Sequence, residues 1–494
     1  MTSPLYIAVD LGAGSGRVFL AGVDCKGLLL EEMHRAQYPP RIQDGHLRWD
    51  LPFIFGEIKD GIRKAARRGT EMGRPIRSVG IDSWAVDYGL IDSAGELVAE
   101  PVCYRDDRTI GVMDRVFNRI PRSKIFEKTG IQFQNFNTLF QLCAERTDLT
   151  KVQTLLLLPD LINYLLTGSV AAEYTNATTT QMVNAATGNW DSELLEDLNV
   201  PANILPEIVP TGKDLGPLKP EIASELELSS DVRIIAPATH DTASAIAAAP
   251  LGKNQAYISS GTWSLIGVER NERLTDAETA RLNFTNTGGA FGSVCFLKNV
   301  MGLWIFESCR REWQAKGLDA AYDAIIADAA AMREPTPLIF PDDERFLNPP
   351  SMLAAIQQQI VETGQTFDPK PAVVAKVIFD SLALRYASVL RSIEELTGEQ
   401  VVGIQILGGG GRNRYLNQMT SDASGLPTRA GLAEATVVGN VLVQAIADGR
   451  FSSLSEGREY VAESFRFDEF APGHSTEIDE ASGRYRLIEK RFIG

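Results

Sequence analysis

The first clear pattern in the chain is an apolar run interrupted by a loop of small residues. Residues 5–24 read Leu-Tyr-Ile-Ala-Val-Asp-Leu-Gly-Ala-Gly-Ser-Gly-Arg-Val-Phe-Leu-Ala-Gly-Val-Asp. The first apolar run reaches Asp10, and apolar residues resume in alternation after the loop. Short apolar runs bounded by Gly-rich turns are typical of β-strands. The segment therefore predicts a strand, a tight loop and a second strand.

A helix and another strand are predicted next. Ile54, Ile58 and Ile62 recur at helical spacing after Asp50, a suitable N-cap, so residues 51–68 are expected to form a helix. The basic run at 63–68 is interpreted as the solvated face of this helix, not as a patch that binds nucleic acid. A further strand is predicted to run into Asp82.

The second half of the chain repeats the opening pattern. Residues 256–268 read Ala-Tyr-Ile-Ser-Ser-Gly-Thr-Trp-Ser-Leu-Ile-Gly-Val and can be laid over 7–23 with Gly261 on Gly12, an offset of 249 residues. An offset of half the chain indicates an internal duplication. Two similar domains are expected, with an exposed connection near 246–254.

Three further elements are predicted towards the C-terminus. Apolar residues at helical spacing from Val374 to Leu396 indicate a long helix that stops at Gly398. A strand is expected at 401–407, a four-glycine loop at 408–411 and a helix at 413–423. Another helix is expected over about 434–447. The tail from about 453 is charged and aromatic and has no clear period.

The composition is that of a folded globular protein. The chain has 494 residues, of which 44% are apolar and 23% charged, so two or three domains are expected. The net charge of −16 disfavours binding to nucleic acid, although a local basic pocket can still exist on an acidic protein.

The chain lacks the features of membrane and secreted proteins. Its longest apolar stretch, at 154–166, is broken by Pro159 and Asp160, whereas a membrane helix needs about 20 apolar residues. The start of the chain does not resemble a secretory leader. The five Cys are scattered without a Cys-x-x-Cys motif, and none of the four His has metal-ligand spacing. A cytoplasmic protein without a membrane or nucleic-acid partner is expected.

The Gly-rich loop at 12–16 is a candidate for binding phosphate. It does not fit a dinucleotide-binding motif, because Arg17 stands where the third Gly is needed and a strand follows instead of a helix. A Gly-x-x-x-x-Gly-Lys-Ser/Thr motif is absent as well. A hairpin that exposes backbone N–H groups can still hold phosphate oxygens. An ordinary hairpin turn is the alternative interpretation of this loop.

Two aspartates at element boundaries are candidates for chemistry. Asp10 ends its strand and could hold Mg²⁺ through water, or it could only cap a turn. Asp241 lies between an apolar strand and a helix. It could be a general base for phosphoryl transfer, or only a helix N-cap. His240 could contact the substrate or pack in the core, and the Gly408–Gly411 loop could accept an adenosine group or be a plain turn.

Taken together and in order, these segments resemble the sugar kinases of the FGGY group, within the actin–hexokinase ATPase fold, and the rhamnulokinase branch above all. The resemblance covers nearly the whole chain. The segments that carry it are Val-Asp-Leu-Gly-Ala-Gly-Ser-Gly-Arg (9–17), Gly-Ile-Asp-Ser-Trp-Ala-Val-Asp (80–87), Tyr-Arg-Asp-Asp-Arg-Thr (104–109), Gly-Ile-Gln-Phe-Gln-Asn-Phe-Asn-Thr-Leu-Phe-Gln-Leu (130–142), Tyr-Thr-Asn-Ala-Thr-Thr-Thr-Gln (174–181), Thr-His-Asp-Thr-Ala-Ser-Ala (239–245), Ser-Ser-Gly-Thr-Trp-Ser (259–264), Lys-Asn-Val-Met-Gly-Leu-Trp (298–304) and Gly-Gly-Gly-Gly-Arg-Asn (408–413).

The resemblance implies a role for each matching residue. It makes Asp241 the catalytic base and Asp10 the carboxylate on the metal side. The residues implied to contact the sugar are Ala85, His240, Asp241, Thr242 and Asn299. The residues implied to bind ATP are Ala13, Gly14, Ser15, Gly16 and Arg17 in a first phosphate loop, Thr262 in a second, and Gly409 and Gly410 in an adenosine loop.

One substrate-side position departs from the family pattern. The segment at 82–87 usually reads Asp-Thr-Trp-Gly-Val-Asp in the rhamnulokinases, whereas this chain has Ser83 and Ala85. The methyl group of Ala85 takes space that Gly would leave open to a ligand.

The resemblance also implies an architecture and a reaction. It predicts an α/β protein with two actin/hexokinase-like (ribonuclease H-like) domains and a catalytic cleft between them. Residues 1–247 would mainly bind sugar, 248–452 would mainly bind nucleotide, and 453–494 would be a tail that packs on the core. The protein would be a monomer or homodimer that uses ATP and Mg²⁺ to phosphorylate the primary hydroxyl of a ketose, L-rhamnulose above all, to L-rhamnulose 1-phosphate.

Three rival functions remain at this point. The first is a kinase for another ketose, such as L-fuculose or xylulose. The second is an inactive sugar sensor on the same fold, which the presence of Asp10 and Asp241 disfavours. The third is a nicotinamide dehydrogenase, which the missing third Gly and the missing helix disfavour.

Overall fold

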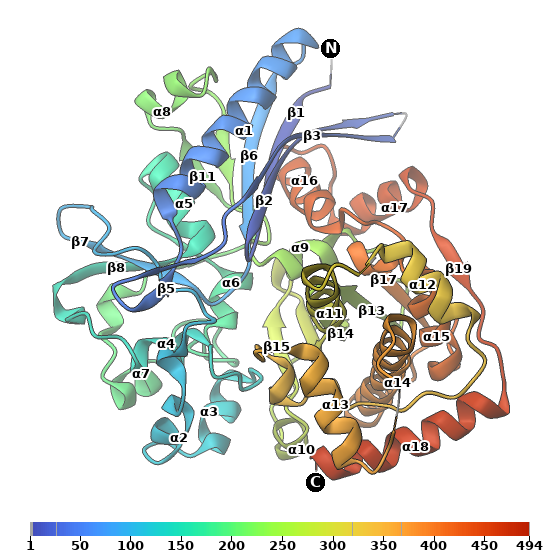
Figure 1. Cartoon of the computed structure of the whole chain (residues 1–494). Coiled ribbons are helices and arrows are strands. Elements are labelled where there is room, and N and C mark those ends of the chain that lie inside the picture. The colour runs from blue at the N-terminus through green and yellow to red at the C-terminus, as the bar shows by residue number, and fades with distance from the viewer. Residues whose placement is uncertain (1–2, 26, 319, 367, 494) are drawn as a thin grey trace. The chain divides into compact units, whose positions relative to one another are not determined.

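The computed structural model describes residues 3–25, 27–318, 320–366 and 368–493, and the chain divides into two compact units (Figure 1). The first unit contains the residues up to Pro250 together with 269–296 and 434–464. The second unit contains 251–268, 297–433 and 465–494. Each unit has its own sheet with helices around it.

The sheet of the first unit has six strands in the order β11-β12-β6-β1-β2-β3. Strands β1 (Leu5–Gly12) and β2 (Ser15–Asp24) form an antiparallel hairpin, and β6 (Ile76–Ser83) lies parallel to β1. This register places Asp10 opposite Arg17 on one side and Asp82 on the other. The strand–loop–strand prediction for 5–24 and the strand ending near Asp82 are confirmed.

Helix α1 (Leu51–Glu71) covers the apolar residues of this sheet. The side chain of Asp50 accepts a hydrogen bond from Phe53 N, which caps the helix, and Ile54 and Ile62 are fully buried. The predicted helix is confirmed and runs three residues further. Its residues Arg63, Arg67 and Arg68 pair with acidic neighbours, and Arg67, which contacts Glu227, remains 62% exposed. The interpretation of this run as a solvated face holds.

The other elements of the first unit surround the sheet. Its further strands are β3 (Gly27–Gln37), β4 (Arg41–Gln43), β5 (His46–Arg48), β7 (Tyr88–Asp92), β8 (Val152–Leu157), β9 (Ala172–Glu173), β10 (Ile208–Val209), β11 (Asp214–Pro217), β12 (Arg233–Ile235) and β15 (Thr285–Gly288). Its further helices are α2 (Val112–Phe117), α3 (Arg122–Thr129), α4 (Thr138–Cys143), α5 (Leu158–Thr167), α6 (Tyr174–Thr179), α7 (Ser192–Leu198), α8 (Pro220–Glu225), α9 (Asp241–Ala248), α10 (Ala277–Arg281), α16 (Ala435–Ala447) and α17 (Leu454–Ser464).

The strands of the second unit follow the order β16-β14-β13-β17-β18-β19. Their bounds are β13 (Gln255–Ser260), β14 (Trp263–Arg270), β16 (Val294–Met301), β17 (Gly403–Leu407), β18 (Thr428–Ala430) and β19 (Asp468–Phe470). The helices are α11 (Trp304–Ala315), α12 (Tyr322–Ala331), α13 (Met352–Glu362), α14 (Pro371–Thr397), α15 (Arg414–Ser424) and α18 (Thr476–Ile493). Helices α14 and α15 pack side by side, and α14 ends at Gly398 in the left-handed conformation, as predicted.

The same three-strand arrangement occurs in both units. In the first, β1 pairs antiparallel with β2 and parallel with β6. In the second, β13 pairs antiparallel with β14 and parallel with β17. The repeated sequence pattern thus corresponds to a repeated structural motif.

The tail without a clear period is folded. Strand β19 pairs with β18, and Tyr485 and Ile488 of α18 pack in a buried cluster with Leu338, Phe340 and Leu384. Among the described residues, no helix is both long enough and apolar enough to cross a membrane.

Candidate active site

The Gly-rich loop between β1 and β2 is a tight hairpin whose tip is open. Gly14 has a φ of +135°, which favours glycine, and its N–H donates to the Gly12 carbonyl at 2.8 Å. Gly16 is buried, and a Cβ there would collide with the Tyr38 ring and Leu11. In contrast, Ala13 and Ser15 are exposed. The base of the loop is therefore tightly packed, while its tip is exposed.

Arg17 is held at the base of this loop by two carboxylates. Its guanidinium donates to Asp10 Oδ2 at 2.5 Å and to the carboxylate of Glu434, which precedes α16. Burial raises the pKa of the Asp10 carboxyl, Arg17 lowers it, and the nearby Asp241 and Glu434 raise it further. The contact between Glu434 and Arg17 was not predicted, because the sequence places Glu434 only at the start of a helix.

Asp241 is the first residue of α9 and does not cap the helix. The cap position falls on His240, no side chain makes a capping hydrogen bond at this end, and Asp241 Oδ1 accepts from the Thr242 hydroxyl at 3.1 Å. The N-cap interpretation of Asp241 is therefore wrong. Burial raises the pKa of the Asp241 carboxyl to about 6, against the hydrogen bonds from Thr242. A carboxylate with a pKa near neutrality is suited to general-base chemistry.

His240 is a neutral imidazole next to this carboxylate. Burial lowers the pKa of the His240 ring to about 4, so the ring carries no charge at neutral pH. Its Nε2 lies 3.6 Å from Asp241 Oδ1, and its buried Nδ1 has no hydrogen-bond partner within the part of the chain that the structure describes. A buried ring nitrogen without a partner fits a site where a ligand hydroxyl supplies the missing hydrogen bond.

The turn that carries Ala85 is held in a strained conformation. Val86 has a φ of +70°, which is rare for a β-branched residue. Its carbonyl accepts from the Thr138 hydroxyl at 2.7 Å and from Gln141 Nε2 at 3.2 Å, both on α4. Ala85 is partly exposed within this turn, so the clamp on Val86 sets the position of Ala85.

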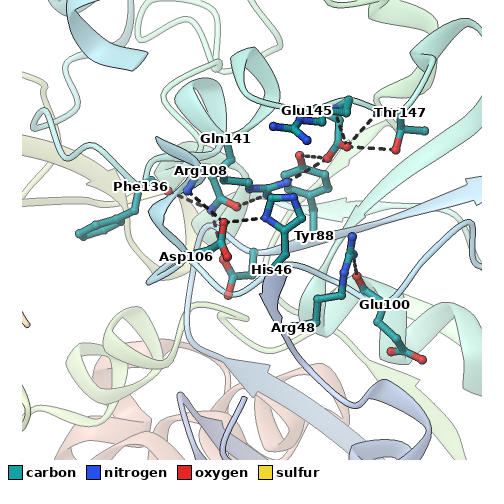
Figure 2. Close-up of polar contacts among 12 residues, drawn as sticks. His46, Arg48, Tyr88, Glu100, Asp106, Arg108, Phe136, Gln141, Glu145 and Thr147 are labelled. Atoms are coloured by element: carbon teal, nitrogen blue, oxygen red, sulfur yellow. Dashed lines mark hydrogen bonds and ion pairs between the residues drawn. The ribbon is translucent and has the colours of Figure 1, made fainter. Parts of the chain in front are cut away.

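Asp87, which follows Val86, is held in place by hydrogen bonds from indole and amide groups. Its Oδ2 accepts from Trp49 Nε1 at 2.7 Å and Trp84 Nε1 at 2.9 Å, and its Oδ1 accepts from Gln141 Nε2 at 3.1 Å. Burial raises the pKa of Asp87 to about 6. Figure 2 shows Gln141 between Arg108 and Phe136, and Arg108 donates to Gln141 Oε1 at 2.7 Å.

The segments 104–109 and 130–142, to which the sequence assigned no role, meet the segment 80–87 here. Arg108 of the second segment also donates to Glu145 at 3.1 Å, and Tyr88 donates to the same Glu145 oxygen (Figure 2). Together with Gln141 of the third segment, these contacts form a polar support behind the Ala85 turn.

Asp82 is a buried carboxylate beside Asp10 that the sequence placed only at a strand end. Its Oδ2 accepts from Asn440 Nδ2 at 2.5 Å, while its Oδ1 has no hydrogen-bond partner among the described residues. The next residue, Ser83, forms an isolated parallel bridge with His240. Asp10 and Asp241 both lie close enough to Asp82 to raise the pKa of its carboxyl, so the three carboxylates form one acidic cluster in which Asp241 is partly exposed.

Helix α16 supports this site through a close contact with α9. A Cβ on Gly439 would overlap the backbone carbonyl of Ser244 in α9. Gly439→Ala is expected to destabilise the fold by about 1–3 kcal/mol, because a packed backbone must move. Gly56→Ala in α1 is the matched control, since its Cβ would meet open space and should stabilise the helix by up to about 1 kcal/mol. Urea unfolding of both variants checks this, and an equal change in the two would contradict the contact.

In the second unit, the four-glycine loop packs against Ser260, two residues before Thr262. Thr262 is the tip residue of the β13–β14 turn, and its carbonyl accepts from Gly302 N at 3.1 Å. The loop is a short 3₁₀ turn at Gly409–Arg412, in which a Cβ on Gly410 would overlap the Ser260 hydroxyl of β13. Gly410 is thus required for packing, whereas Gly409 is exposed and has open space above it.

Asn299 lies in β16, and its side chain is partly exposed. Three residues later, the Gly302 backbone runs against the Thr262 turn. Asn299 and Thr262 therefore belong to neighbouring segments of the second unit, while Asp10, Arg17, Ala85 and Asp241 belong to the first.

The fold and these features define a carbohydrate kinase, and the chain belongs to the FGGY family. Its N-terminal domain, "FGGY family of carbohydrate kinases, N-terminal domain", matches residues 5–248, and the corresponding C-terminal domain matches 256–447. This membership, and the strand that follows the Gly-rich loop, rule out the nicotinamide dehydrogenase.

The chain is similar over nearly its whole length to proteins named rhamnulokinase. It is 40% identical to the rhamnulokinase of Oceanobacillus iheyensis over 93% of this chain and 96% of that protein. It is 40% identical to that of Bacteroides thetaiotaomicron over 96% of this chain and 97% of that protein.

Solved structures share the fold at low identity. The ligand-bound xylulose kinase of Lactobacillus acidophilus superimposes with a TM-score of 0.81 at 18% identity, covering 99% of this chain and 97% of that chain. Plasmodium falciparum glycerol kinase with ADP gives a TM-score of 0.81 at 15% identity, covering 99% and 98%. The predicted two-domain α/β kinase fold is confirmed.

Proposed function

We propose that the protein transfers the γ-phosphoryl group of ATP to the primary hydroxyl of a ketose, and that its sugar is L-rhamnulose, which becomes L-rhamnulose 1-phosphate. The rhamnulokinases that are 40% identical over nearly the full chain support this choice of sugar. The observation that carries the chemistry is Asp241, a carboxylate at the start of α9 whose pKa burial raises to about 6.

In this proposal Asp241 orients the attacking hydroxyl and accepts its proton. The reaction needs little covalent help from the protein, so positioning and charge neutralisation provide most of the rate. The neutral His240 ring, the Thr242 hydroxyl, the Ala85 turn and Asn299 are the residues that we assign to the sugar. The unpartnered His240 Nδ1 supports such a contact.

The nucleotide is assigned to three loops. The exposed tip of the hairpin at Ala13, Gly14, Ser15 and Gly16 and the Thr262 turn bind phosphate oxygens. Arg17 contributes a guanidinium that Asp10 and Glu434 already orient. The open backbone at Gly409 accepts the adenosine group, with Gly410 holding the loop against Ser260.

FGGY kinases use ATP with a divalent metal ion, and we propose Mg²⁺ for this protein. Among the described residues, no group of three or more His, Cys, Asp or Glu side chains could ligate a metal directly. The orphaned Asp82 Oδ1 and the neighbouring Asp10 instead fit a hydrated ion that Asp10 contacts through water. When bound, the ion would neutralise charge on the ATP phosphates.

We place the protein in the cytoplasm, as a monomer or homodimer acting on two small molecules. The five cysteines are free, and three of them are buried, as is usual for a protein in a reducing compartment.

A coupled ADP-release assay over a panel of ketoses and aldoses tests the proposal. L-Rhamnulose should give the highest kcat/KM, and removal of Mg²⁺ should abolish ADP release. Release that does not depend on any sugar would contradict the kinase assignment, and a higher kcat/KM for L-fuculose or xylulose would contradict the choice of sugar.

The Ala85 turn should influence which ketose is preferred. One methyl group in a pocket changes discrimination by about 1–3 kcal/mol, or roughly 10–200-fold. Ala85→Gly is therefore expected to shift the ratio of kcat/KM between L-rhamnulose and L-fuculose, while the KM for ATP stays nearly constant. Steady-state kinetics with both sugars on both proteins measure this ratio. An unchanged ratio would mean that residue 85 does not face the sugar.

A further inference from the structure

Glu173 is a fully buried carboxylate at the end of β9 that accepts hydrogen bonds from six donors. Three of these donors belong to the start of α6, and the other three come from Thr211 and Thr239. The distances are 2.9 Å from Thr175 N, 2.5 Å from Thr175 Oγ1, 3.4 Å from Asn176 N, 2.7 Å from Thr211 Oγ1, 3.0 Å from Thr239 N and 3.0 Å from Thr239 Oγ1.

Capping of α6 explains only part of this arrangement. A cap needs only the contacts to Thr175 and Asn176, two and three residues after Glu173. The contacts to Thr239 join it to a residue 66 positions away. The N–H groups of Thr175, Asn176 and Thr239 can only donate to this carboxyl group, whereas the three threonine hydroxyls can donate or accept. Burial raises the pKa of the Glu173 carboxyl, and the hydrogen bonds from its partners oppose that shift.

Thr239 is the link to Asp241, two residues further on. Glu173 holds the N–H of Thr239, and Ser83 N donates to the Thr239 carbonyl at 2.9 Å, so this residue is fixed on both sides. The hydroxyl of Thr175, itself bound to Glu173, accepts from His240 N at 3.2 Å. Since no side chain caps α9, these contacts position its first residue.

We propose that Glu173 is a positioning residue for Asp241, acting through Thr239 and Thr175. This inference rests on the proposed role of Asp241 as the base. A displacement of about 1 Å in a reacting group can lower a rate by about 100-fold, so a support of this kind is important for turnover.

Two substitutions of Glu173 distinguish its contact with Thr239 from its capping of α6. Asp is a good N-cap, so Glu173→Asp keeps the cap of α6, but its shorter side chain cannot also reach Thr239. Glu173→Gln keeps the contact with Thr239, because the longer side chain is retained and its amide oxygen can face Thr239. Its NH₂ group can then donate to the Thr211 hydroxyl, which can accept. The inference expects Glu173→Asp to lower kcat by about 10–100-fold and Glu173→Gln to lower it by less than about tenfold.

The kinetics are measured in wild type and in an Asp241→Asn background, with thermal unfolding of every variant. If Glu173 acts through Asp241, Glu173→Asp should change the residual rate of Asp241→Asn by less than about threefold. Thr211→Val, which removes one Glu173 partner outside the Thr239–Asp241 segment, is the matched control and should leave kcat within about threefold.

The outcomes separate the two proposals. If Asp241→Asn keeps its turnover, the proposed base is wrong. Suppose that Asp241→Asn loses turnover but folded Glu173→Asp keeps it: only the positioning role of Glu173 is then overturned. The same conclusion follows if Glu173→Asp lowers kcat equally in the wild-type and Asp241→Asn backgrounds. If Glu173→Asp does not fold, Thr239→Val decides, because it removes one of the two Thr239 contacts. It should lower kcat several-fold in the wild-type background alone, and an unchanged kcat would overturn the inference.

Discussion

Replacing Asp241 with Asn is expected to lower kcat by about 10²–10⁴-fold while the protein remains folded. This is the range that general-base catalysis contributes. Asn has nearly the same shape but cannot take a proton from the sugar hydroxyl. The KM for ATP should change little, since Asp241 is not among the residues assigned to the nucleotide. Steady-state kinetics with saturating sugar measure the effect.

The raised pKa of Asp241 provides two controls for this variant. The base must be ionised, so wild-type kcat should fall about tenfold per pH unit below pH 6 and level off above it. A carboxyl whose pKa is raised on folding makes the protein less stable as pH rises from about 3.8 to about 6. Asn removes this penalty, so the variant's Tm at pH 8 should not be lower than that of wild type. Turnover within a few-fold of wild type would rule Asp241 out as the base.

Asp10→Asn is expected to weaken the use of Mg²⁺ by about 10–100-fold, the usual effect of losing a residue that supports a metal ion without ligating it directly. The concentration of Mg²⁺ that gives half-maximal rate should rise accordingly, and excess Mg²⁺ should restore part of the rate. A titration of Mg²⁺ at fixed ATP and sugar measures this shift.

The control for this prediction is Glu434→Gln. Asp10→Asn also removes one of the two carboxylates that hold Arg17, and Glu434→Gln removes the charge of the other. If the Mg²⁺ requirement shifts equally in both variants, the effect comes from Arg17 and the metal-side role of Asp10 is wrong.

Much of this site could be predicted because its parts are local in sequence. The β1–β2 hairpin, its repeat in β13–β14 and the strand–helix junction at Asp241 all have short-range patterns of apolar residues and Gly. The resemblance to the FGGY kinases then assigned roles that the patterns alone left open. The roles of the individual site residues remain predictions, and so does the division into a sugar domain and a nucleotide domain.

The supporting residues could not be predicted because their partners are distant in the sequence. Glu173 reaches Thr239, Asp82 reaches Asn440, and Arg17 reaches Glu434. No period or motif reveals such pairs. The alternative interpretation of Asp241 as an N-cap was wrong for a related reason, because the start of α9 is held by tertiary contacts and no side chain caps it. The structure of the tail could not be predicted from its sequence, because Tyr485 and Ile488 are buried against residues more than 90 positions earlier.

The position of the phosphoryl group in the product tests the central claim most directly. Wild-type protein, MgATP and L-rhamnulose labelled with ¹³C at C1 are followed by ³¹P and ¹³C NMR. The proposed chemistry predicts a phosphate ester whose phosphorus couples to C1, formed in step with ADP and formed at least about 100-fold more slowly with Asp241→Asn. An ester at another carbon, or inorganic phosphate as the sole product, would contradict it.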